Sequence, residues 1–199
     1  MSFEQPVKVP IERVGVVIGK DGSTKKELEE VLGIKLEVDS RSGTVIVKSE
    51  SVGDSDPFVA VRVVEAIARG FSPQRARRLT EEGVTLEIID LRDYGGKSAS
   101  SLDRIRGRVI GLKGKSRRVI EELTHCYISV YGRTVSIIGE QEEVQLASQA
   151  VRMLASGSQH KTVYDMLQKA RTKRKLERMF LWEGSLPEAL LRKTGSGDA

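Results

Sequence analysis

The feature that most constrains this chain is an internal repeat. An apolar segment that ends in Gly-x-x-Gly occurs twice, at residues 19–22 and at residues 111–114. Each copy is followed by a basic, helix-forming run and then by two short segments with alternating apolar residues. A set of elements that recurs in the same order predicts two domains of one kind. The 199 residues are enough for each domain to bury its own core.

The composition is that of a globular protein, with 39% hydrophobic and 31% charged residues. No apolar run approaches the roughly 20 residues needed to cross a bilayer, and the first residues do not resemble a signal peptide. We therefore expect no membrane contact and a cytoplasmic protein. The single cysteine and the absence of Cys/His zinc spacing predict no disulfide, no metal and no cofactor.

Hydrophobic periodicity and turn residues predict the order β-α-α-β-β-α in both repeats, an α+β fold. The expected elements of the first repeat are strand 6–10, helices 11–18 and 23–32, strands 34–38 and 44–48, and a helix from Pro57. Those of the second are strand 84–91, helices 100–110 and 115–124, strands 127–131 and 134–138, and helix 140–154. The expected divisions are a first domain at 1–71, a helical connector at 72–83, a second domain at 84–157, a basic C-terminal helix at 158–184 and a flexible tail at 185–199.

The two glycine-bounded loops suit a nucleic-acid backbone. Glycine has no Cβ, so a phosphate can approach closely, and the amides at the start of the next helix favour an anion. The net charge is +5, and the basic residues gather after both loops, in 75–78, in 104–108 and in 169–175. Such clusters suit a polyanion, although a single cluster is more often a solvated helix face.

The sequence Val-Ile-Gly-x-x-Gly within β-α-α-β-β-α resembles type I KH domains and occurs here in both repeats, at 17–22 and at 109–114. The whole chain, from about residue 5 to residue 182, resembles the archaeal members of a family of KH-domain small-subunit ribosome-assembly factors. The eukaryotic counterparts partner a PIN-domain endonuclease that trims small-subunit rRNA. The matching stretches are 68–72, 86–91, 101–111, 120–124 and 162–164. The resemblance implies two tandem type I KH domains, each with a three-stranded antiparallel sheet packed against helices, plus the C-terminal helix.

The resemblance also implies binding of single-stranded RNA near the 3′ end of small-subunit rRNA, docking to an assembly nuclease or a translation initiation factor, and no catalysis. Eukaryotic members look degenerate at the first loop, whereas it is intact here, so the sequence allows two RNA sites. In the second loop Leu112 stands where KH loops often carry a basic residue. An alternative from another class is a protein-interaction adaptor whose KH domains serve mainly as a scaffold.

The expected RNA-binding residues are the two loops, the cations beside them and part of a groove between the first helix of each repeat and the first strand of its hairpin. They are Gly19, Lys20, Asp21, Gly22, Lys25, Lys26, Arg106, Gly111, Leu112, Lys113, Gly114, Lys115, Arg117, Arg118 and Ile128. Further candidates for the groove floor are Val14, Val17, Leu36, Val38, Val109 and Val130, and alternating apolar residues of this kind are as often core.

The residues give little support to a catalytic function. His125 and Cys126 directly precede the predicted strand 127–131, and adjacent positions on an extended chain point to opposite faces, which is poor geometry for a nucleophile and its base. The acidic clusters around Asp56 and at 140–143 lie at predicted helix starts, where capping and the helix dipole explain them. The sequence therefore predicts a binding protein and no enzyme.

Overall fold

The structure is a computed structural model that describes residues 3–49, 56–96 and 98–183. The expected tail at 185–199 lies outside the described residues. Among the described residues, no helix combines the length and apolar character that crossing a membrane requires.

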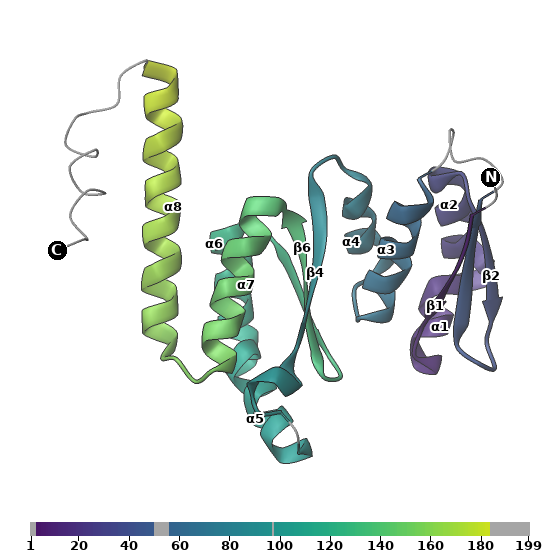
Figure 1. Ribbon diagram of the computed structural model, residues 1–199, viewed down its shortest axis with the longest axis horizontal. Helices are drawn as coiled ribbons and strands as arrows, with labels where there is room; N and C mark the ends of the chain where they lie inside the picture. Colours follow the sequence, from purple (N-terminus) through teal and green to yellow (C-terminus); the bar gives the residue numbers. More distant parts are fainter. Residues whose placement is uncertain (1–2, 50–55, 97, 184–199) are drawn as a thin grey trace.

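The first repeat forms a three-stranded antiparallel sheet in the order β1-β3-β2 with helices packed against it (Figure 1). Its elements are β1 Phe3–Lys8, α1 Ile11–Ile18, the 3₁₀ turn η1 Lys20–Gly22, α2 Ser23–Leu32, β2 Lys35–Asp39, β3 Thr44–Ser49 and α3 Pro57–Ala68. The first strand begins three residues earlier than expected because Phe3 already pairs with Ser49. Asp56 caps α3 by accepting a hydrogen bond from the Val59 amide at 3.0 Å, which explains this acidic residue without a metal.

The second repeat has the same order, and its sheet runs β4-β6-β5. Its elements are β4 Val84–Asp90, η3 Leu91–Tyr94, α5 Ala99–Ile110, η4 Leu112–Gly114, α6 Lys115–Thr124, β5 Tyr127–Tyr131, β6 Thr134–Glu140 and α7 Gln141–Ala155. Ser98 starts α5 with a capping box that involves Ser101. Two copies of β-α-α-β-β-α, each with an antiparallel sheet, confirm the predicted α+β class.

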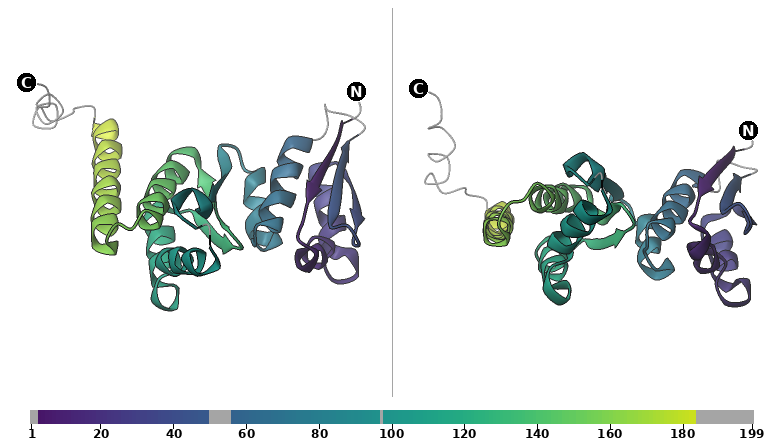
Figure 2. Two further views of the ribbon diagram at one scale, coloured as in Figure 1. Left: turned by 60° about the horizontal axis from the view of Figure 1, so that its bottom comes forward. Right: turned by 90° about the horizontal axis from the view of Figure 1, so that it is seen from below.

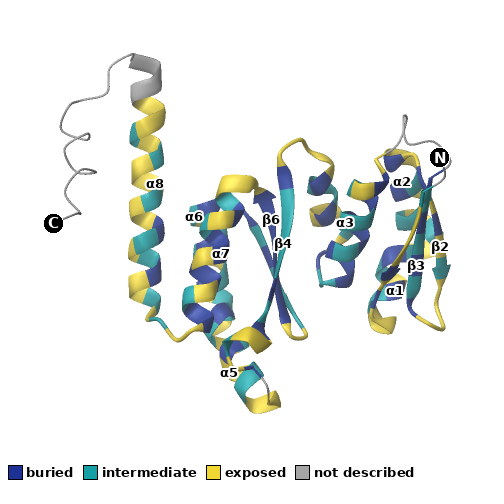
Figure 3. Cartoon of the chain, in the orientation of Figure 1, coloured by how far each residue is buried: buried dark blue, intermediate teal, exposed yellow. Residues whose placement is uncertain are grey.

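The central strand of the second sheet, β6, is buried on both faces, and this joins the two domains. Ile137 on β6 packs against the helices of its own domain, whereas Ile138 belongs to the same core cluster as Ala76, Leu79 and the first domain. All of β6 except Glu140 is buried (Figure 3). The first domain therefore packs against the outer face of the second sheet.

The chain between the repeats lies at this interface. It contains α4 Pro73–Ala76 and η2 Arg77–Thr80, which follow directly on the end of α3. At the same interface the Ser129 hydroxyl donates a hydrogen bond to the Arg69 carbonyl at 2.9 Å, and the Tyr131 hydroxyl donates to Glu12. The contacts tie β5 of one domain to α1 and α3 of the other.

The last helix, α8 His160–Glu183, packs along α6 and α7 at the end of the molecule opposite the first sheet (Figure 2). Val163 and Leu167 are fully buried in the second core. The Arg108 guanidinium donates hydrogen bonds to the carbonyls of Leu154 at 3.1 Å and Ser158 at 2.6 Å, which braces the turn before α8. The first half of α8 is thus fixed to the second domain.

Candidate nucleic-acid interface

The two Gly-x-x-Gly loops have the same backbone conformation. Gly19 and Gly111 have φ/ψ of 76°/178° and 73°/175°, and each is followed by a left-handed residue at the third position of the loop, Asp21 or Lys113. The matching dihedrals show that the repeat in sequence is also a repeat in local structure.

The first glycine of each loop is sterically required. A Cβ on Gly19 would lie 2.3 Å from Thr24 Oγ1, and a Cβ on Gly111 would lie 2.6 Å from Ser116 Cβ. Both distances are too short for non-bonded atoms, so no other residue fits there without displacing the next helix. The close packing places the start of α2 or α6 directly against its loop.

The helices that begin at the loops have no side-chain cap, although the first amide of each is bonded within its loop, Ser23 N–H to the Lys20 carbonyl and Lys115 N–H to the Leu112 carbonyl. Neither α2 nor α6 has a side-chain cap, whereas Asp56, Ser72 and Ser98 cap α3, α4 and α5. Uncapped amides at a helix N-terminus carry partial positive charge and bind anions. With the left-handed loop before them, they form a suitable site for a phosphate.

Most of the predicted cations surround these amides. Those exposed at or next to a loop are Lys20, Lys26, Lys113, Lys115 and Arg118. The Arg118 guanidinium donates a hydrogen bond to the Lys113 carbonyl at 3.0 Å and so braces the left-handed residue. Leu112 is 83% exposed at the tip of the second loop.

Three other predicted cations are half-buried and lie near carboxylates. Lys25 is 3.8 Å from Glu29, Arg117 is 3.7 Å from Glu121, and Arg106 is 3.2 Å from Asp103. Part of their charge is therefore compensated. The Nε atom of Arg106 is buried and has no hydrogen-bond partner within the described residues.

The expected groove floor is largely core. Val14, Val17, Leu36, Val109 and Ile128 are at most 3% exposed and belong to the two hydrophobic clusters, whereas Val38 and Val130 are half-buried. The Ile128 side chain therefore has no surface to offer a base, which corrects the expected role of this residue. Alternation along the strand identified the inward face but could not show that the helices seal it.

Sequence reasoning missed a carboxylate that holds the edge strand in each repeat. Glu29 accepts a hydrogen bond from the Leu36 amide at 2.8 Å, and Glu121 accepts one from the Ile128 amide at 2.8 Å. These glutamates occupy the seventh position of α2 and of α6. Their identical position in the repeat was the signal that could have indicated a shared contact.

The connector supplies cations to both domains, and Arg77 pairs with Glu27 of α2 in the first. The Arg75 and Arg78 guanidiniums lie 4.9 and 5.4 Å from the centre of the Tyr127 ring, and Arg75 is also 3.7 Å from Glu121. Stacking of a guanidinium on an aromatic ring is favourable and holds its position. The second groove is therefore built partly by residues from outside its own repeat.

The pair His125 and Cys126 does not form a reactive centre. Burial raises the pKa of the Cys126 thiol to about 11, so the thiol is protonated at neutral pH. Cys126 is 2% exposed, whereas His125 is exposed. In the described part of the chain, no three His, Cys, Asp or Glu side chains are grouped to hold a metal.

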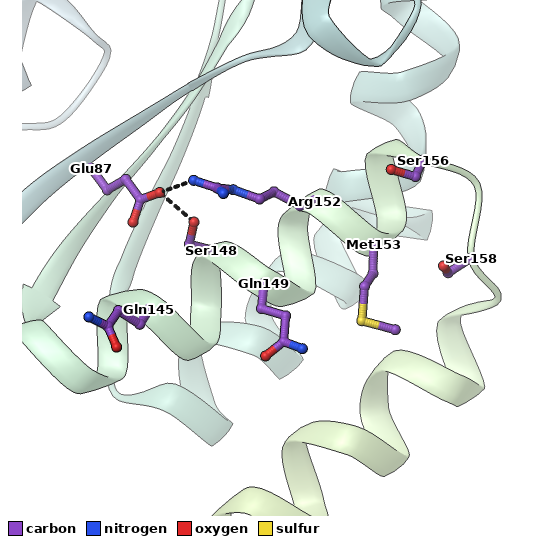
Figure 4. A pocket seen from close by; sticks show the side chains of 8 residues that line it. All are labelled: Glu87, Gln145, Ser148, Gln149, Arg152, Met153, Ser156 and Ser158. Atoms are coloured by element: carbon purple, nitrogen blue, oxygen red, sulfur yellow. Dashed lines mark hydrogen bonds and ion pairs between the residues drawn. The ribbon is translucent and has the colours of Figure 1, made fainter.

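A separate hollow of about 410 Å³ lies between β4 and α7 (Figure 4). The carboxylate of Glu87 in this hollow accepts hydrogen bonds from Ser148 at 2.5 Å and from Arg152 at 2.6 Å. The guanidinium of Arg152 balances its negative charge. None of its lining residues belongs to the loops or to α5 and α6. The loops remain the better candidate for binding an anionic polymer.

Comparison with known proteins agrees with this geometry. Residues 4–54 match the profile described as "KH domain", and residues 85–172 match a profile for the second KH domain of PNO1, described as "Eukaryotic type KH-domain (KH-domain type I)". A KH domain-containing protein of Methanocaldococcus jannaschii is 46% identical over 180 residues, which cover 89% of this chain and 78% of that protein.

Two crystal structures from Pyrococcus horikoshii are also similar. Dim2p is 45% identical with a TM-score of 0.78, and the match covers 84% of this chain and 99% of Dim2p. A complex of a/eIF2alpha, aDim2p and rRNA contains a chain that is 43% identical with a TM-score of 0.81, and this match covers 87% and 96% of the two chains. The resemblance to KH-domain ribosome-assembly factors is thereby confirmed: the chain belongs to the archaeal family of tandem KH-domain proteins that includes Dim2p.

Proposed function

We propose that this protein binds single-stranded RNA of the small ribosomal subunit, in the 3′ region of the rRNA, during ribosome maturation, and that it catalyses no reaction itself. The observation that carries the proposal is the pair of loops with matching backbone, required first glycines and uncapped helix amides. The Pyrococcus horikoshii relative in complex with rRNA supports rRNA as the ligand. The site of action would be the cytoplasm.

The binding mode follows from the loop geometry. The amides and lysines at each loop hold the phosphates, which fixes the strand without selecting its sequence. Each KH loop clamps about four nucleotides of backbone. Base selection would then depend on the half-buried surface beside β2 and β5, where Val38, Val130 and Arg106 retain some exposure.

The test is fluorescence anisotropy with an RNA that matches the mature 3′ end of small-subunit rRNA, beside a scrambled RNA and over a salt series. Each phosphate contact on a single strand contributes about 0.7 to the slope of log K against log salt. We expect the native RNA to bind more tightly than the scrambled one at every salt concentration. If the native and the scrambled RNA bind equally and salt removes the binding of both, specific recognition would be contradicted.

A charge reversal in the second loop tests the site. Lys113→Asp is compatible with the fold because Asp21 adopts the same left-handed conformation in the first loop, with φ of 53° against 50°. Combined with Leu112→Asp at the exposed tip, it should abolish binding at that loop while the circular dichroism spectrum stays unchanged. The reverse change in the first loop, Asp21→Lys, is the matched control and should strengthen binding.

The adaptor function is a second candidate, supported by two observations. Leu112 is an apolar side chain exposed at the tip of the second loop, and the Pyrococcus horikoshii relative was crystallised with a/eIF2alpha as well as rRNA. Pull-down with this initiation factor subunit and with an rRNA-processing nuclease would test it. If the second-loop variant loses the protein partner and keeps its RNA affinity, the adaptor function is the better description.

A further inference from the structure

A basic cleft lies at the far end of α6 from the second loop. Its volume is about 440 Å³, and it is formed by the connector, the α6–β5 corner, α7 and α8. The lining residues include five cationic side chains against two acidic ones. The cations are Arg78, Arg171, Arg174, Lys175 and Arg178, and the acids are Glu140 and Glu143.

The charge in this cleft is poorly compensated. Arg174 is 3.8 Å from Glu143, and Arg78 is 3.6 Å from Glu81. Among the described residues, Arg171, Lys175 and Arg178 have neither an ion pair nor a hydrogen bond and are exposed. Like charges gathered without partners repel one another, so an anion in the cleft would relieve the repulsion.

The fold holds Arg78 in place and fixes the start of the helix that carries the other cations. Arg78 is fixed by its contact with the Tyr127 ring and by a hydrogen bond of 3.0 Å to the His125 carbonyl. Val163 and Leu167 anchor the first half of α8 in the core, and Arg171 lies at the end of that half. Beyond that anchored half, α8 is mostly exposed (Figure 3). Arg78 is therefore pre-organised for a ligand, whereas the exposed cations of α8 would lose side-chain freedom on binding.

The position of the cleft favours RNA as the anion. The ten residues of α6 extend about 15 Å from the second loop to the corner at His125. Lys115 and Arg118 are exposed at i and i+3 on the face of α6 that leads from the loop toward exposed His125 at the cleft, and the one carboxylate on this face is Glu122 at i+7. We propose that the cleft binds the phosphate backbone of the same single-stranded RNA beyond the segment held by the second loop. This proposal rests on the proposed function and extends it to a second, sequence-independent contact.

A matched pair of variants tests the cleft. Arg171→Glu with Lys175→Glu reverses two cations that line it, at i and i+4. Lys169→Glu with Lys173→Glu is the control, because it makes the same charge change at the same spacing on the same helix. At 100° per residue, these two positions lie on the face of α8 opposite Arg171. Both lysines are exposed, and neither lines the cleft.

The measurement uses the full chain and two RNAs, one of about four nucleotides, which suffices for one KH loop, and one of about twelve. For the longer RNA we expect the cleft variant to bind about tenfold more weakly and its salt slope to fall by about 1.4, two contacts at about 0.7 each. The control variant and the shorter RNA should show neither change. A neutral version, Arg171→Gln with Lys175→Gln, should give a smaller loss in the same direction and serves if the Glu variant folds poorly.

Several results would overturn the proposal. These are equal losses for the cleft and control variants, or a loss that is the same for both RNAs, since either would indicate only a general effect of charge. Full RNA affinity in the cleft variant together with lost binding of polyglutamate would assign the cleft to an acidic protein. The Leu112→Asp, Lys113→Asp variant separates the two proposals. If it binds both RNAs normally while the cleft variant loses the longer one, the cleft binds RNA, but the second loop does not hold the adjoining segment and the loop proposal fails.

Discussion

Substitution of Gly70 by alanine should loosen the contact between the two domains. Gly70 has a left-handed φ of +98°, and a Cβ there would lie 2.7 Å from Ser129 Oγ and 2.9 Å from Tyr131 Cβ. Both neighbours belong to β5 of the other domain. The Tyr131 atom is close to the backbone and cannot move away as the end of a flexible side chain could.

The expected cost has two parts. A side chain in a left-handed conformation costs about 1–2 kcal/mol, and insertion of a methyl group into a packed interface costs about 1–3 kcal/mol. Gly70→Ala should therefore reduce the free energy of unfolding by about 2–5 kcal/mol. Gly157→Ala is the matched control, because Gly157 has φ of +102° but no atom within 4 Å of its Cβ position. Gly157→Ala should show only the cost of the left-handed conformation, about 1–2 kcal/mol.

The assay is urea denaturation of both variants followed by circular dichroism, with a distance measurement between spin labels on the two sheets. We expect Gly70→Ala to lose about 1–3 kcal/mol more than Gly157→Ala and to broaden the distance distribution between the domains. Equal losses in the two variants would show that the close approach at Gly70 contributes nothing and would refute the argument for a fixed domain interface.

Three further predictions concern single residues of the second domain. Because burial raises the pKa of Cys126 to about 11, alkylation of the native thiol should be slow at pH 8 and accelerate toward pH 11. The contribution of the protonated thiol to the free energy of unfolding is complete below the ordinary thiol pKa and is lost as pH rises toward 11. An alkylation rate of the native protein with its midpoint below pH 9 would contradict this. His125→Gly should stabilise the protein by about 0.5–1 kcal/mol in thermal unfolding, because His125 has φ of 57° where Gly33 stands in the first repeat; a lower Tm would be inconsistent with strain there. The hydrogen bond with Arg92 lowers the pKa of Asp90, so its contribution of about 0.5–1 kcal/mol is present above pH 4 and lost on acidification. Asp90→Asn should remove this acid dependence from urea denaturation curves, and an unchanged dependence would reject the assignment.

The fold class and the two loops could be predicted because their signals are local. The alternation in Leu36 and Val38 and the glycines at 19 and 111 act within one strand or one turn. The same local reasoning assigned residues to the groove floor that are in fact buried in the core. It showed that Ile128 faces one side of the sheet, but the helices that cover that side are placed by packing over long sequence distances. The adjacent apolar residues Ile137 and Ile138 are the sequence signal that β6 is buried on both faces.

The sequence by itself determined two α+β repeats, their element order and the two glycine-bounded loops, since hydrophobic period and backbone sterics depend on residues close in the chain. Only the tertiary structure decided that the first domain covers the second sheet, that Arg75 reaches Glu121, and that Arg78 and α8 form one basic cleft. These contacts join residues far apart in sequence. They depend on which apolar faces find each other when both domains are folded, and periodicity within a single element does not contain that information.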